Sequence, residues 1–144
     1  MGRVLAGATA VSASLLLAGC STVLLMTVAG PLDAPVLTPE RRAGPVCLSE
    51  LTIRRAGAPQ ASDDNVVWKI KGRDEECIGF DRLVYGQVPA GFNELAVTRP
   101  LEEGVIYTAM ARGDIQGPLG ALWAGGGAYF FEQGRWRLAA NEAP

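Results

Sequence analysis

Apolar and polar residues alternate in short runs from Val46 onward, and turn residues separate these runs roughly every ten positions. Between Val66 and Lys71 the even positions carry Val, Trp and Ile, whereas the odd positions carry Val and two lysines. Successive side chains of a β-strand point to opposite faces of a sheet. The run therefore predicts a strand whose even positions lie in a core and whose odd positions face water.

The same reading predicts strands along the rest of this region, and no long helical period interrupts them. The predicted strands lie near Val46–Arg54, Asn65–Lys71, Ile78–Gly86, Glu94–Thr98, Gly104–Arg112, Ala128–Glu132 and Arg135–Ala139. Short strands at this spacing are typical of an all-β protein with one small antiparallel β-sandwich. The segment Phe131–Trp136 predicts a hairpin, in which Gly134 supplies the positive φ of a tight turn.

The first nineteen residues have the layout of a secretory signal. Arg3 gives a positive start, and an uncharged stretch rich in Ala, Val and Leu follows from Val4 to Leu17. The uncharged run continues to Leu32, so it would measure roughly 43 Å as a helix, against roughly 30 Å for the hydrocarbon core of a bilayer. An uncleaved transmembrane helix is therefore the alternative to a cleaved signal.

Leu17-Ala18-Gly19-Cys20 resembles the lipobox of bacterial lipoproteins. The resemblance implies that Cys20 receives diacylglycerol through its sulfur and that a dedicated signal peptidase removes residues 1–19. It also implies acylation of the new amino terminus, with palmitate as the expected chain. Two or three acyl chains fit stable attachment, because a single chain anchors only reversibly. Serine directly after the lipidated cysteine, as at Ser21, resembles the lipoproteins that enteric bacteria sort to the outer membrane. The expected location is therefore a lipid anchor in the outer membrane, with the domain in the periplasm or at the cell surface.

Four prolines follow between Pro31 and Pro45, interleaved with charged residues. Proline at this density disfavours a helix, so residues 20–45 are predicted to be a lipidated N-terminus and an extended tether. The tether would carry a β-sandwich domain over residues 46–140, followed by a tail at 141–144. The apolar segment Val23–Val28 would lie in the headgroup boundary or pack on the domain, and the sequence leaves both open.

Three stretches resemble the fibronectin type III or immunoglobulin-like sandwich. Leu101–Tyr107 has the L-x-x-G-x-x-Y corner of that family, in which the tyrosine hydroxyl bonds to backbone upstream of its strand. Phe80–Gly86 is similar to the central C strand, and Trp68 lies where the family has a buried tryptophan on strand B. The resemblance implies a fold of this class. The Gly-rich insertion Gly113–Gly127 departs from it.

The chain contains three cysteines and no histidine. With Cys20 set aside, Cys47 and Cys77 form the one possible pair, which predicts a disulfide in an oxidising compartment; two reduced, buried cysteines are the alternative. Without histidine, neither a Ser-His-Asp nor a Cys-His catalytic site can be built. The net charge is −2 and the basic residues are dispersed, so no nucleic-acid partner is predicted.

Two apolar loops are the candidate contact regions. One holds Phe92 between glycines, and the other is the Gly-rich insertion with Leu119, Leu122 and Trp123. Exposed aromatic anchors would bind an envelope protein, and core burial is the alternative for both aromatic side chains. We expect no catalytic residue, metal, cofactor or small-molecule substrate. The expected function is a non-catalytic binding or accessory module held to the membrane by Cys20, and the alternative is a structural subunit of a larger envelope complex.

Overall fold

The computed structural model describes residues 22–40, 46–57, 62–115 and 121–139, and these residues confirm the prediction of an all-β protein. Two short 3-10 helices, Asp63–Asn65 and Arg73–Glu75, accompany the strands. The strands are β1 (Thr22–Ala29), β2 (Val36–Pro39), β3 (Val46–Arg55), β4 (Val66–Gly72), β5 (Ile78–Gly79), β6 (Leu83–Val84), β7 (Phe92–Ala96), β8 (Tyr107–Ile115), β9 (Ala121–Glu132) and β10 (Arg135–Leu138). Within these ranges no helix has the length and hydrophobicity to span a bilayer.

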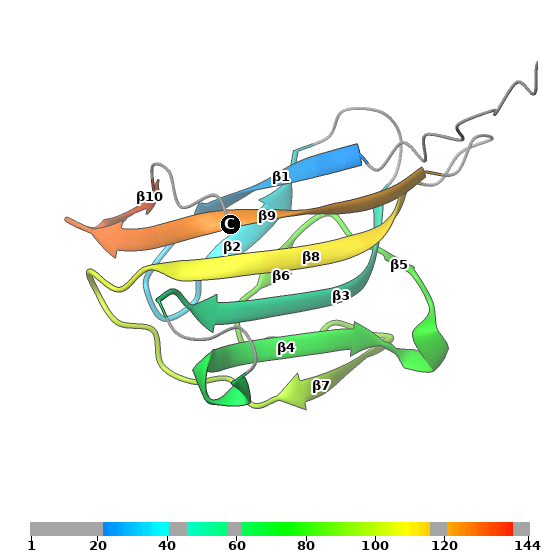
Figure 1. Cartoon of the computed structure of the whole chain (residues 1–144), viewed down its shortest axis with the longest axis horizontal. Helices are drawn as coiled ribbons and strands as arrows, with labels where there is room; N and C mark the ends of the chain where they lie inside the picture. The colour runs from blue at the N-terminus through cyan, green and yellow to red at the C-terminus, as the bar shows by residue number, and fades with distance from the viewer. Residues whose placement is uncertain (1–21, 41–45, 58–61, 116–120, 140–144) are drawn as a thin grey trace, which may run out of the picture.

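The strands form one strongly curled sheet in the order β6-β2-β1-β9-β8-β3-β4-β7, with β10 added to β9 and β5 added to β3. In Figure 1, β9, β8, β3, β4 and β7 make a front layer, and β2 and β6 lie behind it. β1 joins the layers because its first half pairs with β9 and its second half with β2. The arrangement is sandwich-like, but the pairing of β1 with β9 is parallel, so the sheet is mixed and not purely antiparallel as predicted.

The hydrophobic core lies between these layers. Trp68 is fully buried, as its position in the alternating run predicts. Strands from both layers contribute large, fully buried side chains, namely Trp123, Phe92, Leu24, Leu37, Leu48, Leu51, Ile70 and Leu83. Burial of this many apolar groups from segments distant in sequence is what holds the two layers together.

Residues 22–40 belong to the sheet, so the prediction of an extended tether is wrong over that range. Along β1, Leu24 and Met26 are 1% and 3% exposed, whereas Val23 and Leu25 are 66% and 48% exposed. This period of two is the signature of a strand with one buried face. The apolar segment after Cys20 therefore packs on the domain, and the sandwich begins at Thr22, not at residue 46.

The prolines of this segment lie at strand ends. Pro39 closes β2 opposite Met26, and Pro35 comes just before the strand begins. A proline at a strand end costs few ladder hydrogen bonds, so the density of prolines does not prevent pairing here. Residues 41–45, the remainder of the predicted tether, lie outside the described residues.

The Gly-rich insertion is largely a hairpin and not a long loop. β8 continues to Ile115 and β9 starts at Ala121, so most of the glycines lie within paired strands. At Gly125 a Cβ atom would clash with the Leu24 carbonyl oxygen of β1, so glycine allows these two backbones to approach. The predicted β9–β10 hairpin is confirmed, and Gly134 in its turn has a φ of 76°.

Two local predictions need correction. The predicted strand Ile78–Gly86 is two short strands, β5 and β6, and β6 lies at one edge of the sheet instead of at its centre. Val67, predicted to face water, is 2% exposed. The chain after β7 runs alongside it, because Arg99 donates its backbone N–H to the Val67 carbonyl at 2.9 Å.

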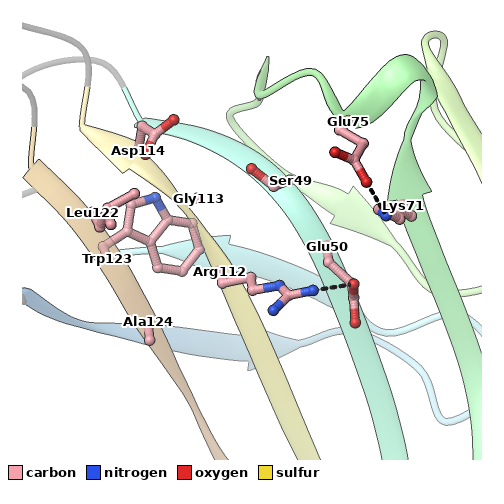
Figure 2. Close-up of a pocket in the computed structure, with 10 residues that line it drawn as sticks. All are labelled: Ser49, Glu50, Lys71, Glu75, Arg112, Gly113, Asp114, Leu122, Trp123 and Ala124. Carbon is pink, nitrogen blue, oxygen red and sulfur yellow. Dashed lines mark hydrogen bonds and ion pairs between the residues drawn. The ribbon is translucent and has the colours of Figure 1, made fainter.

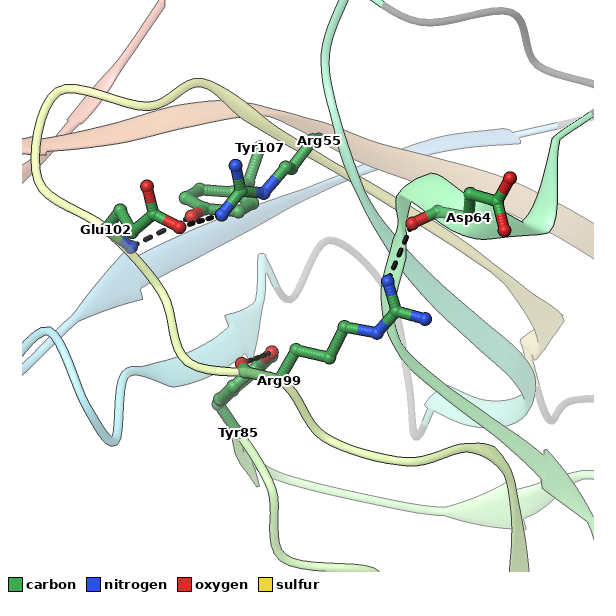
Figure 3. Close-up of polar contacts among 6 residues, drawn as sticks. All are labelled: Arg55, Asp64, Tyr85, Arg99, Glu102 and Tyr107. Carbon is green, nitrogen blue, oxygen red and sulfur yellow. Dashed lines mark hydrogen bonds and ion pairs between the residues drawn. The ribbon is translucent and has the colours of Figure 1, made fainter.

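Tyrosines fix the loops around the sheet, as Figure 3 shows. The Tyr107 hydroxyl accepts the Glu102 N–H at 2.9 Å, which is the predicted bond to backbone upstream of the strand, and Arg55 pairs with the Glu102 carboxylate. The Tyr85 hydroxyl lies 2.6 Å from the Arg99 carbonyl oxygen and also reaches β4. Burial raises the pKa of Tyr85 to about 12, so its hydroxyl keeps its proton for these bonds.

Candidate functional site

We define the outer face as the side of β1, β9, β8, β3 and β4 that is turned away from the core. Strand register places one row of side chains across it: Val23 on β1, Ala124 on β9, Arg112 on β8, Glu50 on β3 and Lys71 on β4. The row is apolar at β1 and β9 and charged at β8, β3 and β4. The outer face therefore has two chemically distinct halves that meet between β9 and β8.

The charged half centres on Glu50, whose side chain is only 17% exposed. Arg112 donates from Nη2 to Glu50 Oε2 at 2.7 Å, and Lys69 Nζ lies 3.4 Å from Glu50 Oε1. Figure 2 shows the Arg112 contact inside an open groove of about 440 Å³. A second pair, Lys71 and Glu75 at 3.1 Å, lines the same groove.

The pKa of Glu50 lies below its usual value of 4.5. Burial by itself raises this pKa, but the hydrogen bond from Arg112 and the charges of Lys69 and Arg112 together outweigh it. The carboxylate is therefore ionised and fully engaged at neutral pH. Such a group is poorly suited to proton transfer, for which a pKa near the working pH is best, but it can orient two cations toward a polar partner.

The apolar half of the outer face is a patch that we call the apolar strip. Its members on β1 and β9 are Val23, Leu25 and Leu122, with Leu122 72% exposed, together with Ala124. Met110 on β8, opposite Gly126 of β9, extends it and is 53% exposed. Exposed apolar residues are common singly, but here the register gathers them on one face of three neighbouring strands.

The predicted contact residues do not lie together. Phe92 and Trp123 are each 2% exposed and belong to the core, where the Trp123 indole N–H donates to the Cys47 carbonyl at 2.9 Å. Leu122 alone among the described candidates is at the surface, because neighbours on a strand face opposite sides. Leu119 and Cys20 lie outside the described residues.

Cys47 and Cys77 are joined in a disulfide, as predicted, with their Cα atoms 5.2 Å apart. The bridge ties the start of β3 to the chain before β5, and the Asp114 N–H donates to the Cys77 sulfur at 3.2 Å. The two sulfurs and the Asp114 carboxylate lie within 4.8 Å of one another. Because a disulfide supplies no thiolate, this group is a structural staple and not a set of metal ligands.

Sequence reasoning missed the Glu50 cluster and the exposed half of β1. Glu50 and Arg112 are 62 positions apart, and their meeting depends on the β3–β8 register, which shifts between Leu48 and Glu50. No local pattern carries that shift. In β1 both faces are apolar, so only the pairing with β9 and β2 shows which side chains face outward.

Comparison of the chain with models of protein families, with curated proteins and with solved structures gave no match.

Proposed function

We propose that the chain is a bacterial lipoprotein, anchored by diacylglycerol on Cys20 after removal of residues 1–19. The observation that supports this most is the position of β1, which begins at Thr22, two residues after the lipobox cysteine. A chain cut before Cys20 keeps every strand described above. The apolar residues that follow the cysteine form a strand, with Leu24 and Met26 in the core, and this weakens the reason to extend a membrane helix through them.

An uncleaved transmembrane helix is the weaker anchor. Residues 22–29 are a strand, so the apolar run open to a helix shortens from Val4–Leu32 to residues 4–21. That is about 27 Å of helix, near the minimum that spans a bilayer. Ser21 supports outer-membrane sorting, with the domain in the periplasm or at the cell surface.

The role that we propose for the domain is non-catalytic, as a binding or accessory module of the envelope. The groove around Glu50 supports this, because the Glu50 carboxylate is held by Arg112 and Lys69, and the Arg112 side chain, which lines the groove, is 65% exposed. Charged groups held in fixed geometry favour recognition of a partner's polar surface. The charged half of the outer face thus offers a surface for binding a polar partner.

We further propose that the sandwich is immunoglobulin-like in topology. The neighbours β6-β2-β1 correspond to an E-B-A layer and β9-β8-β3 to a G-F-C layer. Under this assignment β8 is strand F, and the Tyr107 corner lies at its start, where the family has it. Trp68 then lies on β4, beside strand C, and not on strand B.

Metabolic labelling with a palmitate analogue tests the lipoprotein proposal. The wild-type chain should incorporate the label, and Cys20→Ser should not, because the sulfur that starts processing is gone. The double variant Cys47→Ser/Cys77→Ser is the matched control and should keep the label. An unlabelled wild type, or a labelled Cys20→Ser chain, would show that the proposal is wrong.

The alternative role, a structural subunit of a larger envelope complex, predicts a different size in solution. After extraction in mild detergent, an accessory module should migrate as a monomer, whereas a subunit should migrate with a larger assembly. Native mass measurement of the extract separates the two.

A further inference from the structure

We infer that the apolar strip rests in the headgroup boundary of the bilayer that holds Cys20, so that the β1 and β9 side of the outer face meets the membrane directly while β7 stays away from it. The strip consists of Val23, Leu25, Met110, Leu122 and Ala124. The inference rests on the proposed lipidation of Cys20 and adds to it a defined membrane-facing surface.

The reach of the anchor supports this occupant. Val23 is three steps along the chain from Cys20, and an extended chain spans at most about 3.4 Å per residue, so the Cα atom of Val23 lies within about 10 Å of that of Cys20. The glycerol attached to that sulfur lies at the boundary between headgroups and acyl chains. β1 is therefore held at the membrane surface by its own first residues, with no tether to lift it away.

The register then brings the neighbouring strand to the same place. β1 runs parallel to β9, and Thr22 pairs with Trp123, so Leu122 lies at the end of the sheet from which the anchor leaves. Among the large side chains of the strip, Leu122 and Val23 are the most exposed, at 72% and 66%. Exposure is thus greatest next to the anchor, where a bilayer would cover it.

The charges that border the strip fit a membrane surface with anionic headgroups. Arg112 follows Ala124 in the same row, and its side chain is 65% exposed although it pairs with Glu50. A cation beside inserted apolar groups is the usual arrangement of interfacial membrane contacts. Of the acids in the groove beside the strip, Glu50 is paired with Arg112 and Glu75 with Lys71, and Asp114 lies opposite Leu122, half-buried beside the disulfide.

Depth-dependent quenching in vesicles tests the inference with the full lipidated chain. An environment-sensitive fluorophore is attached to Leu122→Cys on β9, or to Leu95→Cys on β7 as the matched control. Leu95 is 54% exposed and lies four strand spacings from β9, up to about 19 Å away. The vesicles contain phosphatidylethanolamine and phosphatidylglycerol, with a nitroxide on a shallow acyl position as lipid quencher and iodide as aqueous quencher.

The probe at position 122 should be quenched several-fold more strongly by the lipid nitroxide than the probe at position 95, and it should be protected from iodide. Adding Val23→Ser and Leu25→Ser should return the position-122 probe to the behaviour of the control. Equal iodide quenching at both positions would overturn the inference, and so would protection from both quenchers, which would mean that protein covers the strip. If the intact mass of the sample shows no acyl chains on Cys20, the lipoprotein proposal fails instead, so the two failures are distinguishable.

Discussion

A single carboxylate organises the charged half of the outer face. Glu50 receives Arg112 from β8 and Lys69 from β4, so its loss would leave two cations on neighbouring strands without their shared partner. Because the side chain is largely buried, this cluster is screened less than an exposed ion pair. Its effect on stability should therefore be measurable.

The pKa of Glu50 predicts how stability depends on acid. This pKa is lower in the folded protein than the ordinary value of 4.5, so the folded state gains stability from the ionised carboxylate. That gain is fully present above about pH 4.5 and is lost as the pH falls through the lowered pKa. Urea unfolding at pH 7 should show that Glu50→Gln costs about 1 kcal/mol, and the difference from wild type should shrink toward pH 3.

Glu132→Gln is the control for this measurement. Glu132 pairs with Arg137 at 3.8 Å, with both side chains about half exposed, so its replacement should change stability by no more than about 0.5 kcal/mol at either pH. If Glu50→Gln and the wild type differ by the same amount at both pH values, the ion-pair account of the cluster does not hold.

Some strands could be predicted from the sequence pattern and others could not. β4 and the β9–β10 hairpin could be predicted because polar residues mark one face and a glycine marks the turn. β1 could not, because it continues an uncharged apolar run and shows no alternation of polarity, whichever residues are buried. Its strand nature comes from the parallel pairing with β9, about one hundred positions away in the chain.

The assignment of β1 to the fold predicts unequal effects at adjacent positions. Leu24→Ala should destabilise the protein by about 2–5 kcal/mol, because the side chain is 1% exposed and its removal leaves a cavity. Leu25→Ala, one residue along and 48% exposed, should cost about 0.5 kcal/mol or less. Chemical unfolding of the two variants gives the comparison. Equal, small effects would mean that residues 22–29 are a tether outside the folded sheet.

The disulfide should contribute strongly to a domain of this size. It closes a separation of 30 residues, which on the chain-entropy account corresponds to about 3–4 kcal/mol. The double variant Cys47→Ala/Cys77→Ala should therefore unfold at a much lower urea concentration than wild type. Wild type treated with reductant should shift equally, and an unchanged midpoint in both would show that the bridge adds nothing to stability.

For the molecule as a whole, the class of fold could be predicted from the sequence but the surface could not. Of the candidate contact residues, Phe92 and Trp123 are buried in the core. Leu122 is exposed, and only the β1–β9 register shows that it lies on the same face as Val23 and Leu25. Strand parity explains the exchange, because Trp123 must point inward for Leu122 to point outward. The domain begins at Thr22 and not at the predicted residue 46, because Leu24 and Met26 of β1 are part of the core.

We propose a sandwich held to the membrane at its first strand, with two residues of chain between Cys20 and Val23. The intact mass of the protein extracted from its native membrane tests this most directly. The account predicts a chain that begins at Cys20 and carries the added mass of diacylglycerol and an amide-linked acyl chain. A chain that retains residues 1–19 and has no acyl mass would contradict it.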